Sequence, residues 1–219
     1  YNTLKSYEDL QERIIDPNTS EIEKQICIQA LTSSNVPKGE LHWLNEFYQK
    51  ECIRIAIKEA GAEPDDLVFV TDLDEFWNPD LDYQKIDHDH IYKLKQLAYS
   101  GYINMRSSEN WAGTLLTRYK NIEGACLNHY RTPSKTNYVY IDNGGWHFTF
   151  LGGVDQVKLK IESYGHQEYN KDYIKNNVEN LLNEGKDVLG RNEFRFWLDE
   201  SELPKFVLDN KEKYKQFFK

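Results

Sequence analysis

Two aspartates that follow a short apolar run are the strongest candidates for chemistry. Residues 67–71 read Leu-Val-Phe-Val-Thr, and Asp72, Asp74 and Glu75 come directly after them. Valine, phenylalanine and threonine suit a buried strand, whereas acidic residues do not. The strand should therefore end near Thr71 and present Asp72 and Asp74 at its carboxyl end, the edge where open α/β sheets bind ligands.

Two carboxylates one residue apart can hold a hard divalent cation, Mn²⁺ or Mg²⁺, which keeps positions open for phosphate oxygens. Alternate residues of a continuing strand point the same way, so Asp72 and Asp74 can face one cleft. A second interpretation is that Asp72 caps a helix while Asp74 and Glu75 are solvated turn residues. The apolar run before the acids and the aromatic pair 76–77 after them favour the metal site.

His147 is the third candidate metal ligand. It lies in the glycine-rich stretch 143–153, which reads Asn-Gly-Gly-Trp-His-Phe-Thr-Phe-Leu-Gly-Gly. Paired glycines let the backbone turn sharply or approach a ligand, so this stretch can bring His147 to the aspartates as a neighbouring strand. A neutral imidazole suits Mn²⁺. The alternative is a core histidine that is bonded to a backbone carbonyl.

Other charged residues could complete a phosphate or proton-transfer site. Lys158 could neutralise phosphate charge, or it could be a solvated helix lysine. Glu168 is the candidate general base, although an acid at a helix start also interacts favourably with the helix dipole. Glu109 and Asp142 are rivals for the base. The sequence contains none of the P-loop, dinucleotide-binding or serine-hydrolase motifs.

The first half of the chain suggests a crossover leading into the strand that precedes the aspartates. Residues 41–60 form the clearest predicted helix, and Gly61 ends it. The apolar run 26–31 reads as a short strand before that helix. A strand, a helix and the strand 67–71 in this order predict a right-handed crossover with a parallel pair of strands.

The second half predicts further strands and a late helix. Residues 91–105 read as strands with a bend at Gly101, and residues 110–114 as a polar loop with an exposed Trp111. A helix is predicted over 171–184, with Asn170 as its N-cap and a glycine as its stop. Because no repeat or linker is visible, the simplest reading is one α/β domain over residues 1–219.

Composition limits the class of protein. The chain has 219 residues, a formal net charge of −9 and 14% aromatic residues. This length supports one sizeable core, and the negative charge argues against a nucleic-acid surface. The three cysteines lack disulfide or zinc spacing, which favours a reducing compartment such as the cytoplasm. No apolar run reaches membrane-spanning length, so we expect no membrane segment in this chain.

Several motifs occur together in a recognisable order. They are Val-Thr-Asp-Leu-Asp-Glu at 70–75, Gly-Trp-His-Phe at 145–148, the glycine pair 152–153, Lys-Ile-Glu-Ser at 160–163 and His-Gln-Glu-Tyr-Asn at 166–170. This set resembles glycosyltransferase family 17, whose eukaryotic members are β-1,4-mannosyl-glycoprotein β-1,4-N-acetylglucosaminyltransferases that add bisecting N-acetylglucosamine. The resemblance covers roughly residues 40–219.

The resemblance implies a GT-A fold, a Rossmann-like mixed sheet flanked by helices. It also implies an inverting, metal-dependent transfer of a sugar from a nucleotide-sugar donor, usually UDP-N-acetylglucosamine, to a glycan acceptor. Asp72 and Asp74 match the family's D-x-D, and Asp80 matches a further acid. This chain reads Glu-Phe-Trp at 75–77 where the family has Glu-Ile-Pro, and the family's first strand would precede Tyr1.

Two other classes of function stay open from the residues alone. A non-catalytic carbohydrate-binding module on the same fold would suit the aromatic content. A metal-dependent phosphoesterase could use Asp72 and Asp74, although a two-metal centre needs further carboxylate or histidine ligands.

Overall fold

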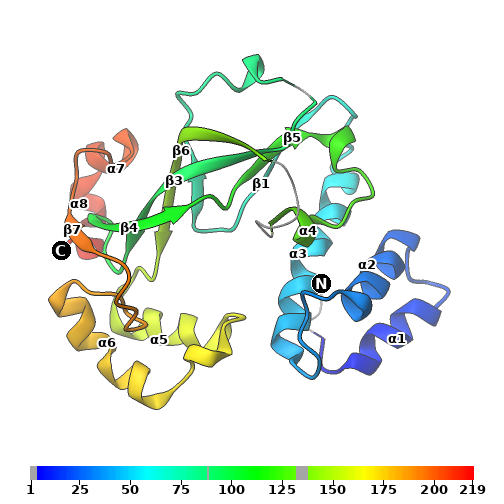
Figure 1. Ribbon diagram of the computed structural model, residues 1–219, viewed down its shortest axis with the longest axis horizontal. Coiled ribbons are helices and arrows are strands. Elements are labelled where there is room, and N and C mark those ends of the chain that lie inside the picture. The colour runs from blue at the N-terminus through cyan, green and yellow to red at the C-terminus, as the bar shows by residue number, and fades with distance from the viewer. Residues whose placement is uncertain (1–3, 88, 132–137) are drawn as a thin grey trace. The chain divides into compact units, whose positions relative to one another are not determined.

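The computed structural model describes residues 4–87, 89–131 and 138–219, and the chain divides into two compact units. The first unit contains residues Tyr1–Val68 and Thr117–Asn137, and the second contains Phe69–Leu116 and Tyr138–Lys219. Figure 1 shows that helices dominate the first unit, whereas the sheet lies mainly in the second. The single domain over residues 1–219 stays a prediction.

Among the described residues, the first unit contains four α-helices, and the first three bury side chains in one apolar core. The four helices are α1 (Tyr7–Ile15), α2 (Glu21–Thr32), α3 (Leu41–Glu59) and α4 (Leu127–Arg131). Serine hydroxyls cap the first two: Ser6 accepts from the backbone N–H of Asp9, and Ser20 accepts from that of Glu23. The predicted helix over 41–60 is confirmed by α3.

The predicted strand over 26–31 is wrong, because these residues belong to helix α2. Ile26, Cys27 and Ala30 are buried in the core of the first unit, while Ile28 is 48% exposed. This is the spacing of one helical face and not of a strand. The predicted crossover from a strand at 26–31 to the strand at 67–71 is therefore also wrong.

The part of the chain that the structure describes forms a mixed sheet of seven strands. They are β1 (Leu67–Val70), β2 (Glu75–Trp77), β3 (Tyr92–Ser100), β4 (Met105–Trp111), β5 (Leu115–Arg118), β6 (Val139–Thr149) and β7 (Phe196–Leu198). The order is β1-β5-β3-β4-β7, and β6 pairs with both β3 and β2. The β3–β6 pair is parallel, whereas β2–β6, β3–β4, β3–β5 and β4–β7 are antiparallel.

Strand β6 brings the glycine-rich stretch against β2. In this antiparallel pair, His147 lies opposite Glu75 and Gly145 lies opposite Trp77. A Cβ atom at Gly145 would be 2.0 Å from the carbonyl oxygen of Phe76, and the φ angle of Gly145 is 134°. Glycine is required here because the two backbones approach closely. Gly145 is therefore needed for the pairing of β2 with β6.

Alternate residues of β6 serve the two faces of the sheet. Trp146 and Phe148 pack into an apolar cluster with Leu203 and Val207 of the C-terminal segment. His147 and Thr149 point to the opposite face. The C-terminal segment forms α7 (Lys205–Asp209), α8 (Lys211–Tyr214) and a 3-10 turn (Lys215–Phe217).

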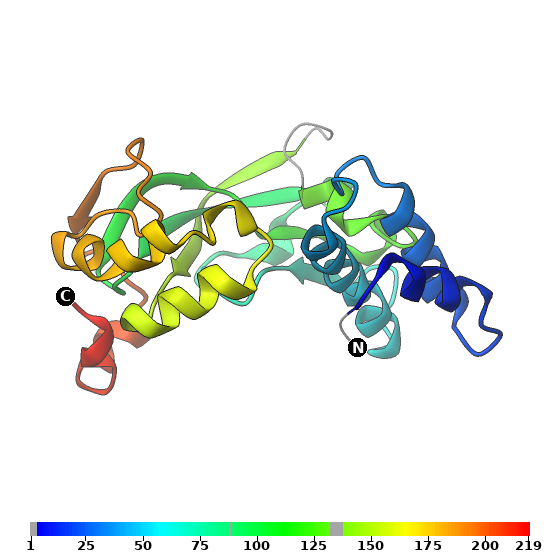
Figure 2. The ribbon, with the colours of Figure 1, turned by 90° about the horizontal axis from the view of Figure 1, so that it is seen from below.

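Helices α5 (Gly153–Ser163) and α6 (Asp172–Glu184) follow β6 and share an apolar core through Val157, Ile161 and Val178. Figure 2 shows them side by side along the sheet. The predicted helix over 171–184 is confirmed, but its N-cap is Lys171 and not Asn170. The side-chain amide of Asn170 instead donates to Gln167 in a preceding 3-10 turn (Gln167–Tyr169). Two further 3-10 turns cover Tyr83–Lys85 and Tyr119–Asn121.

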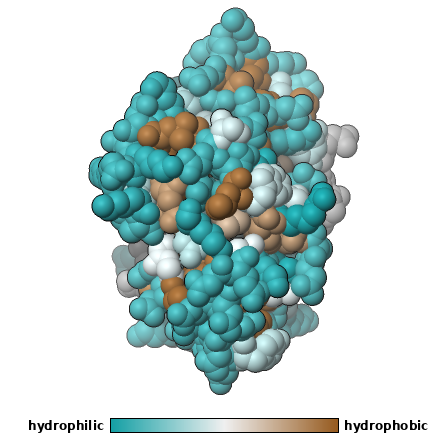
Figure 3. All heavy atoms as spheres, turned by 90° about the vertical axis from the view of Figure 1, so that its left-hand side faces the viewer, coloured by the Kyte–Doolittle hydropathy of each residue, from teal (hydrophilic) through white to brown (hydrophobic). Residues whose placement is uncertain are grey.

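The surface around the C-terminal helices is mostly hydrophilic. Figure 3 shows this side, where hydrophobic residues form small separate patches. Exposed apolar side chains of β7 and α7 include Trp197, Leu198 and Phe206. Within the described part of the chain, no helix combines the length and the apolar character needed to cross a membrane.

Candidate active site

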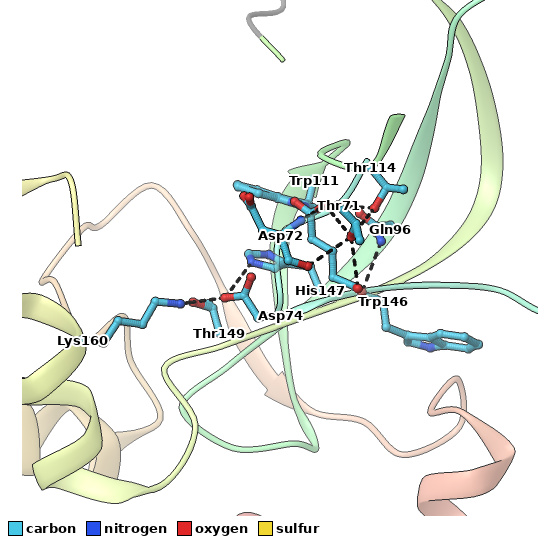
Figure 4. A network of polar contacts seen from close by, with 11 residues as sticks. Thr71, Asp72, Asp74, Gln96, Trp111, Thr114, Trp146, His147, Thr149 and Lys160 are labelled. Carbon is cyan, nitrogen blue, oxygen red and sulfur yellow. Dashed lines mark hydrogen bonds and ion pairs between the residues drawn. The ribbon is translucent and has the colours of Figure 1, made fainter. Parts of the chain in front are cut away.

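Asp74 lies in the turn between β1 and β2 and contacts two residues from other elements. The Nζ atom of Lys160, in α5, donates to Oδ2 of Asp74 at 2.7 Å and to Oγ1 of Thr149 at 2.8 Å. The Nε2 atom of His147, in β6, lies 3.6 Å from the same Oδ2. Figure 4 shows the Asp74 carboxylate between Lys160 and His147. Residues distant in sequence thus form one charged site in the second unit.

The Asp74 carboxyl remains ionised because of these neighbours. Burial alone would raise its pKa, but the polar contact with His147 and the positive charge of Lys160 outweigh that effect. They hold the pKa of the Asp74 carboxyl well below its usual range. The side chain is still 29% exposed, so the carboxylate is both charged and accessible.

His147 is fixed by packing as well as by its position in β6. Its imidazole stacks on the indole of Trp111, with ring centroids 4.1 Å apart and the planes at 16°. Only 6% of His147 is exposed, and its Nδ1 atom is buried without a hydrogen-bond partner among the described residues. The Nε2 edge is therefore the polar edge that faces the site.

Glu75 lies next to the two aspartates but is buried, with 3% of its surface exposed. Its Oε1 atom accepts from the indole Nε1–H of Trp111 at 3.0 Å. Its Oε2 atom accepts from the hydroxyl of Thr114 at 2.9 Å and from the backbone N–H of Asp72 at 3.2 Å. Thr71 also donates to Oε2, at 3.2 Å. The interpretation of Glu75 as a solvated turn residue is therefore wrong.

The donor set fits a hard divalent cation that is shared with a phosphate ligand. No group of three His, Cys, Asp or Glu side chains within the described ranges could hold a metal ion by itself. However, the contacts of Asp74 all use Oδ2, which leaves Oδ1 for a ligand. Mg²⁺ and similar ions are commonly held by one or two carboxylates together with substrate phosphates and water. Asp74 can supply one carboxylate oxygen of such a coordination shell.

The other residues proposed for metal and phosphate binding occupy three separate positions. Asp72 is half-buried, and its backbone N–H is held by Glu75. Asp80 is exposed in the turn after β2, where its backbone N–H donates to the side chain of Asn78. Lys158 is half-buried in α5, and the structure gives it no hydrogen bond or ion pair within the described residues. The lysine that contacts Asp74 is Lys160.

The three candidate bases occupy different elements. Glu168, in the 3-10 turn after α5, pairs with Nδ1 of His166 at 2.7 Å and is 54% exposed. Glu109, in β4, lies 3.8 Å from the guanidinium of Arg191. Asp142, in β6, pairs with Lys95 at 2.8 Å and is 84% exposed. The role of Glu168 as the base stays a prediction.

Four residues of this site did not emerge as site residues from the sequence: Lys160, Glu75, Trp111 and Thr114. Trp111 was expected to be exposed in a loop, but it ends strand β4 and its ring is half-buried. Glu75 carried no signal of its role, since an acid beside two aspartates reads as solvated.

Comparison with known protein families gives a match over nearly the whole chain. The model of glycosyltransferase family 17 matches residues 16–218 of this chain. No curated protein and no solved structure gives a significant match.

Proposed function

The chain belongs to glycosyltransferase family 17, and from this premise we propose that it transfers a sugar from a UDP-sugar donor to a hydroxyl of a glycan acceptor. We assign N-acetylglucosamine as the sugar, inversion as the stereochemical course and a GT-A fold as the framework. The mixed sheet flanked by helices is consistent with that framework. The reaction depends on a divalent cation, Mn²⁺ or Mg²⁺.

The observation that carries this proposal is the Asp74 carboxylate between Lys160 and His147. An ionised, accessible carboxylate at a strand end suits a cation that also binds a diphosphate. A lysine 2.7 Å away supplies a positive charge that can move to a phosphate oxygen when a donor binds. A module that binds only neutral sugar does not require a carboxylate and a lysine paired in this way, whereas a diphosphate with its cation is suited by that pairing.

Each group then has a defined part in the reaction. Asp72 and Asp74 would hold the cation together with phosphate oxygens of the donor, Nε2 of His147 would help to orient the Asp74 carboxylate, and Asp80 would contact the donor nearby. The bound cation would neutralise the negative charge that develops on the UDP leaving group. Lys160 binds the same diphosphate, a role for which Lys158 was the sequence-based candidate. Glu168 takes the proton from the acceptor hydroxyl as that oxygen attacks the anomeric carbon.

The direct test is binding of UDP with and without MnCl₂, measured by calorimetry on the purified chain. The proposal expects UDP to bind with Mn²⁺ and to bind much more weakly after the metal is chelated. Asp74→Asn should abolish the metal-dependent part of UDP binding. Asp142→Asn, which changes an exposed aspartate of β6, should leave UDP binding unchanged. UDP binding that is indifferent to metal and to Asp74 would refute the assignment.

The same samples distinguish the two other classes of function. Stabilisation by a free glycan, but not by UDP, would indicate a carbohydrate-binding module. Turnover of a generic phosphate ester that depends on Asp74 would indicate a phosphoesterase. Transfer to a glycan acceptor, followed by NMR of the anomeric proton of the product, would establish the donor sugar and the stereochemical course together.

A further inference from the structure

We propose that Glu75 is the positioning residue of this site. Its buried carboxylate holds the Asp72–Asp74 turn and the Trp111–His147 stack in one arrangement. The catalytic consequence rests on the proposed function, whereas the positioning itself can be tested without it. Glu75 would touch neither the donor nor the acceptor.

The contacts of Glu75 join three separate segments. On one side Oε2 accepts from the backbone N–H of Asp72 and from the hydroxyl of Thr71, so it holds the turn that carries both aspartates. On the other side Oε1 accepts from the indole of Trp111. Thr114 donates to Oε2 from the segment between β4 and β5. One carboxylate thereby determines where the backbone of Asp72 and the ring of Trp111 lie relative to each other.

The arrangement extends from Trp111 to His147 and then to Asp74. The indole that donates to Glu75 is the ring on which His147 stacks. Glu75 and His147 are also opposite each other in the β2–β6 ladder. The edge of His147 that faces Asp74 is therefore oriented by the ladder and by the Trp111 stack, and Glu75 takes part in both. Figure 4 shows Trp111, His147 and Asp74 close together.

Glu75 is an unsuitable metal or proton-transfer group, because it is only 3% exposed and both its oxygens accept hydrogen bonds from the protein. Its surroundings are also adapted to its position. A Cβ atom at Gly113 would lie 1.9 Å from Oε1 of Glu75 and 2.6 Å from Nε1 of Trp111. A glycine at 113 keeps that space free for the hydrogen bond between the two side chains.

Three variants test the proposal. Glu75→Gln keeps the side-chain shape, but its amide group must present N–H to a donor on one side, either Trp111 or Asp72. Trp111→Phe and Thr114→Val each remove one donor while the carboxylate stays in place, so they remain informative if Glu75→Gln does not fold. The matched controls are Trp197→Phe, which alters an exposed tryptophan of β7, and Thr117→Val, which removes another buried hydroxyl, in β5.

The first measurement is independent of activity. In ¹⁵N–¹H NMR spectra, the indole N–H of Trp111 is identified by its loss in Trp111→Phe. In Glu75→Gln we expect this signal and the amide of Asp72 to shift, because one of the two loses its acceptor and the other keeps only a neutral one. Exchange with solvent should accelerate about tenfold or more for the group that loses its acceptor. In Thr114→Val the same signals should shift, while in both controls they should stay in place.

The second measurement is turnover with UDP-N-acetylglucosamine and a glycan acceptor. A misplaced site should lower kcat by about 10²-fold in Glu75→Gln with little change in KM, while both controls retain wild-type kcat. Unmoved NMR signals would overturn the proposal, and so would moved signals with unchanged kcat. If the wild-type chain transfers no sugar, the proposed function fails, and the NMR result still decides whether Glu75 positions the site.

Discussion

The imidazole of His147 and the indole of Trp111 lie face to face, with centroids 4.1 Å apart. Only one edge of the histidine is used in the site, because Nε2 faces Asp74 while Nδ1 is buried without a hydrogen-bond partner among the described residues. The ring therefore has two separable functions. Its face contributes packing, and its Nε2 edge contributes the polar contact with the carboxylate.

His147→Phe should separate these two functions. Phenylalanine keeps a ring on Trp111 and removes a buried nitrogen that lacks a partner, so the free energy of unfolding should stay within about 1.5 kcal/mol of wild type. Metal-dependent UDP binding should weaken, because the Nε2 contact that helps to orient the Asp74 carboxylate is lost. His147→Ala should lower the free energy of unfolding by about 3 kcal/mol, since it also leaves a cavity. Urea titration and calorimetry measure the two effects. Equal stability losses in both variants would contradict the argument.

Lys160→Met should weaken UDP binding by about 10- to 100-fold, the usual worth of a charge-assisted hydrogen bond. It should also strengthen binding of Mn²⁺ alone, because Lys160 and the cation compete for the Asp74 carboxylate. The matched control is Lys158→Met on the same helix, which should leave both affinities near wild type. The reverse pattern, with Lys158 as the sensitive position, would restore the sequence-based assignment.

The pH dependence of stability should report the charge of Asp74. Its pKa is lowered in the folded chain, so its contribution to stability is present at neutral pH and is lost as the pH falls below the unfolded value, near 4. The difference in free energy of unfolding between wild type and Asp74→Asn should be constant from pH 7 to about 5 and shrink below about 4. Asp142→Asn removes an exposed ion pair with Lys95. Its free energy of unfolding should differ little from that of wild type at any pH. If the difference in free energy of unfolding between wild type and Asp74→Asn grew as the pH fell, the prediction would be contradicted.

Glu168→Gln should lower kcat by about 10² to 10⁴-fold, the usual contribution of general acid–base catalysis. Affinity for UDP should stay near wild type, because the base acts on the acceptor. Glu109→Gln is the informative companion, since Glu109 lies on the same strand as Trp111 and faces Arg191. Turnover that survives in Glu168→Gln and collapses in Glu109→Gln would transfer the role to Glu109.

Local patterns were sufficient for helix α6 and for the strand before Asp72. The helix over 171–184 and its glycine stop follow from 3.6-residue spacing and from the left-handed conformation that glycine adopts at Gly185. The strand before Asp72 follows from β-branched and aromatic residues that end at acids. The segment 26–31 was misread because its composition suits a strand, while burial of Ile26, Cys27 and Ala30 in the first unit selects a helix. Tertiary packing overrode the local preference there.

The sequence by itself determined that Asp72, Asp74 and His147 are the residues to examine, and that the chain resembles a glycosyltransferase family. It did not determine which lysine contacts the Asp74 carboxylate. Lys158 and Lys160 flank the buried face of α5 formed by Val157 and Ile161, and helical spacing leaves both edges equivalent. The packing of α5 beside the end of β6 selects Lys160, which bonds to Asp74 and Thr149. The buried setting of Glu75 was likewise decided by tertiary structure, because its partners Trp111 and Thr114 lie far along the chain and meet it only when the strands pair.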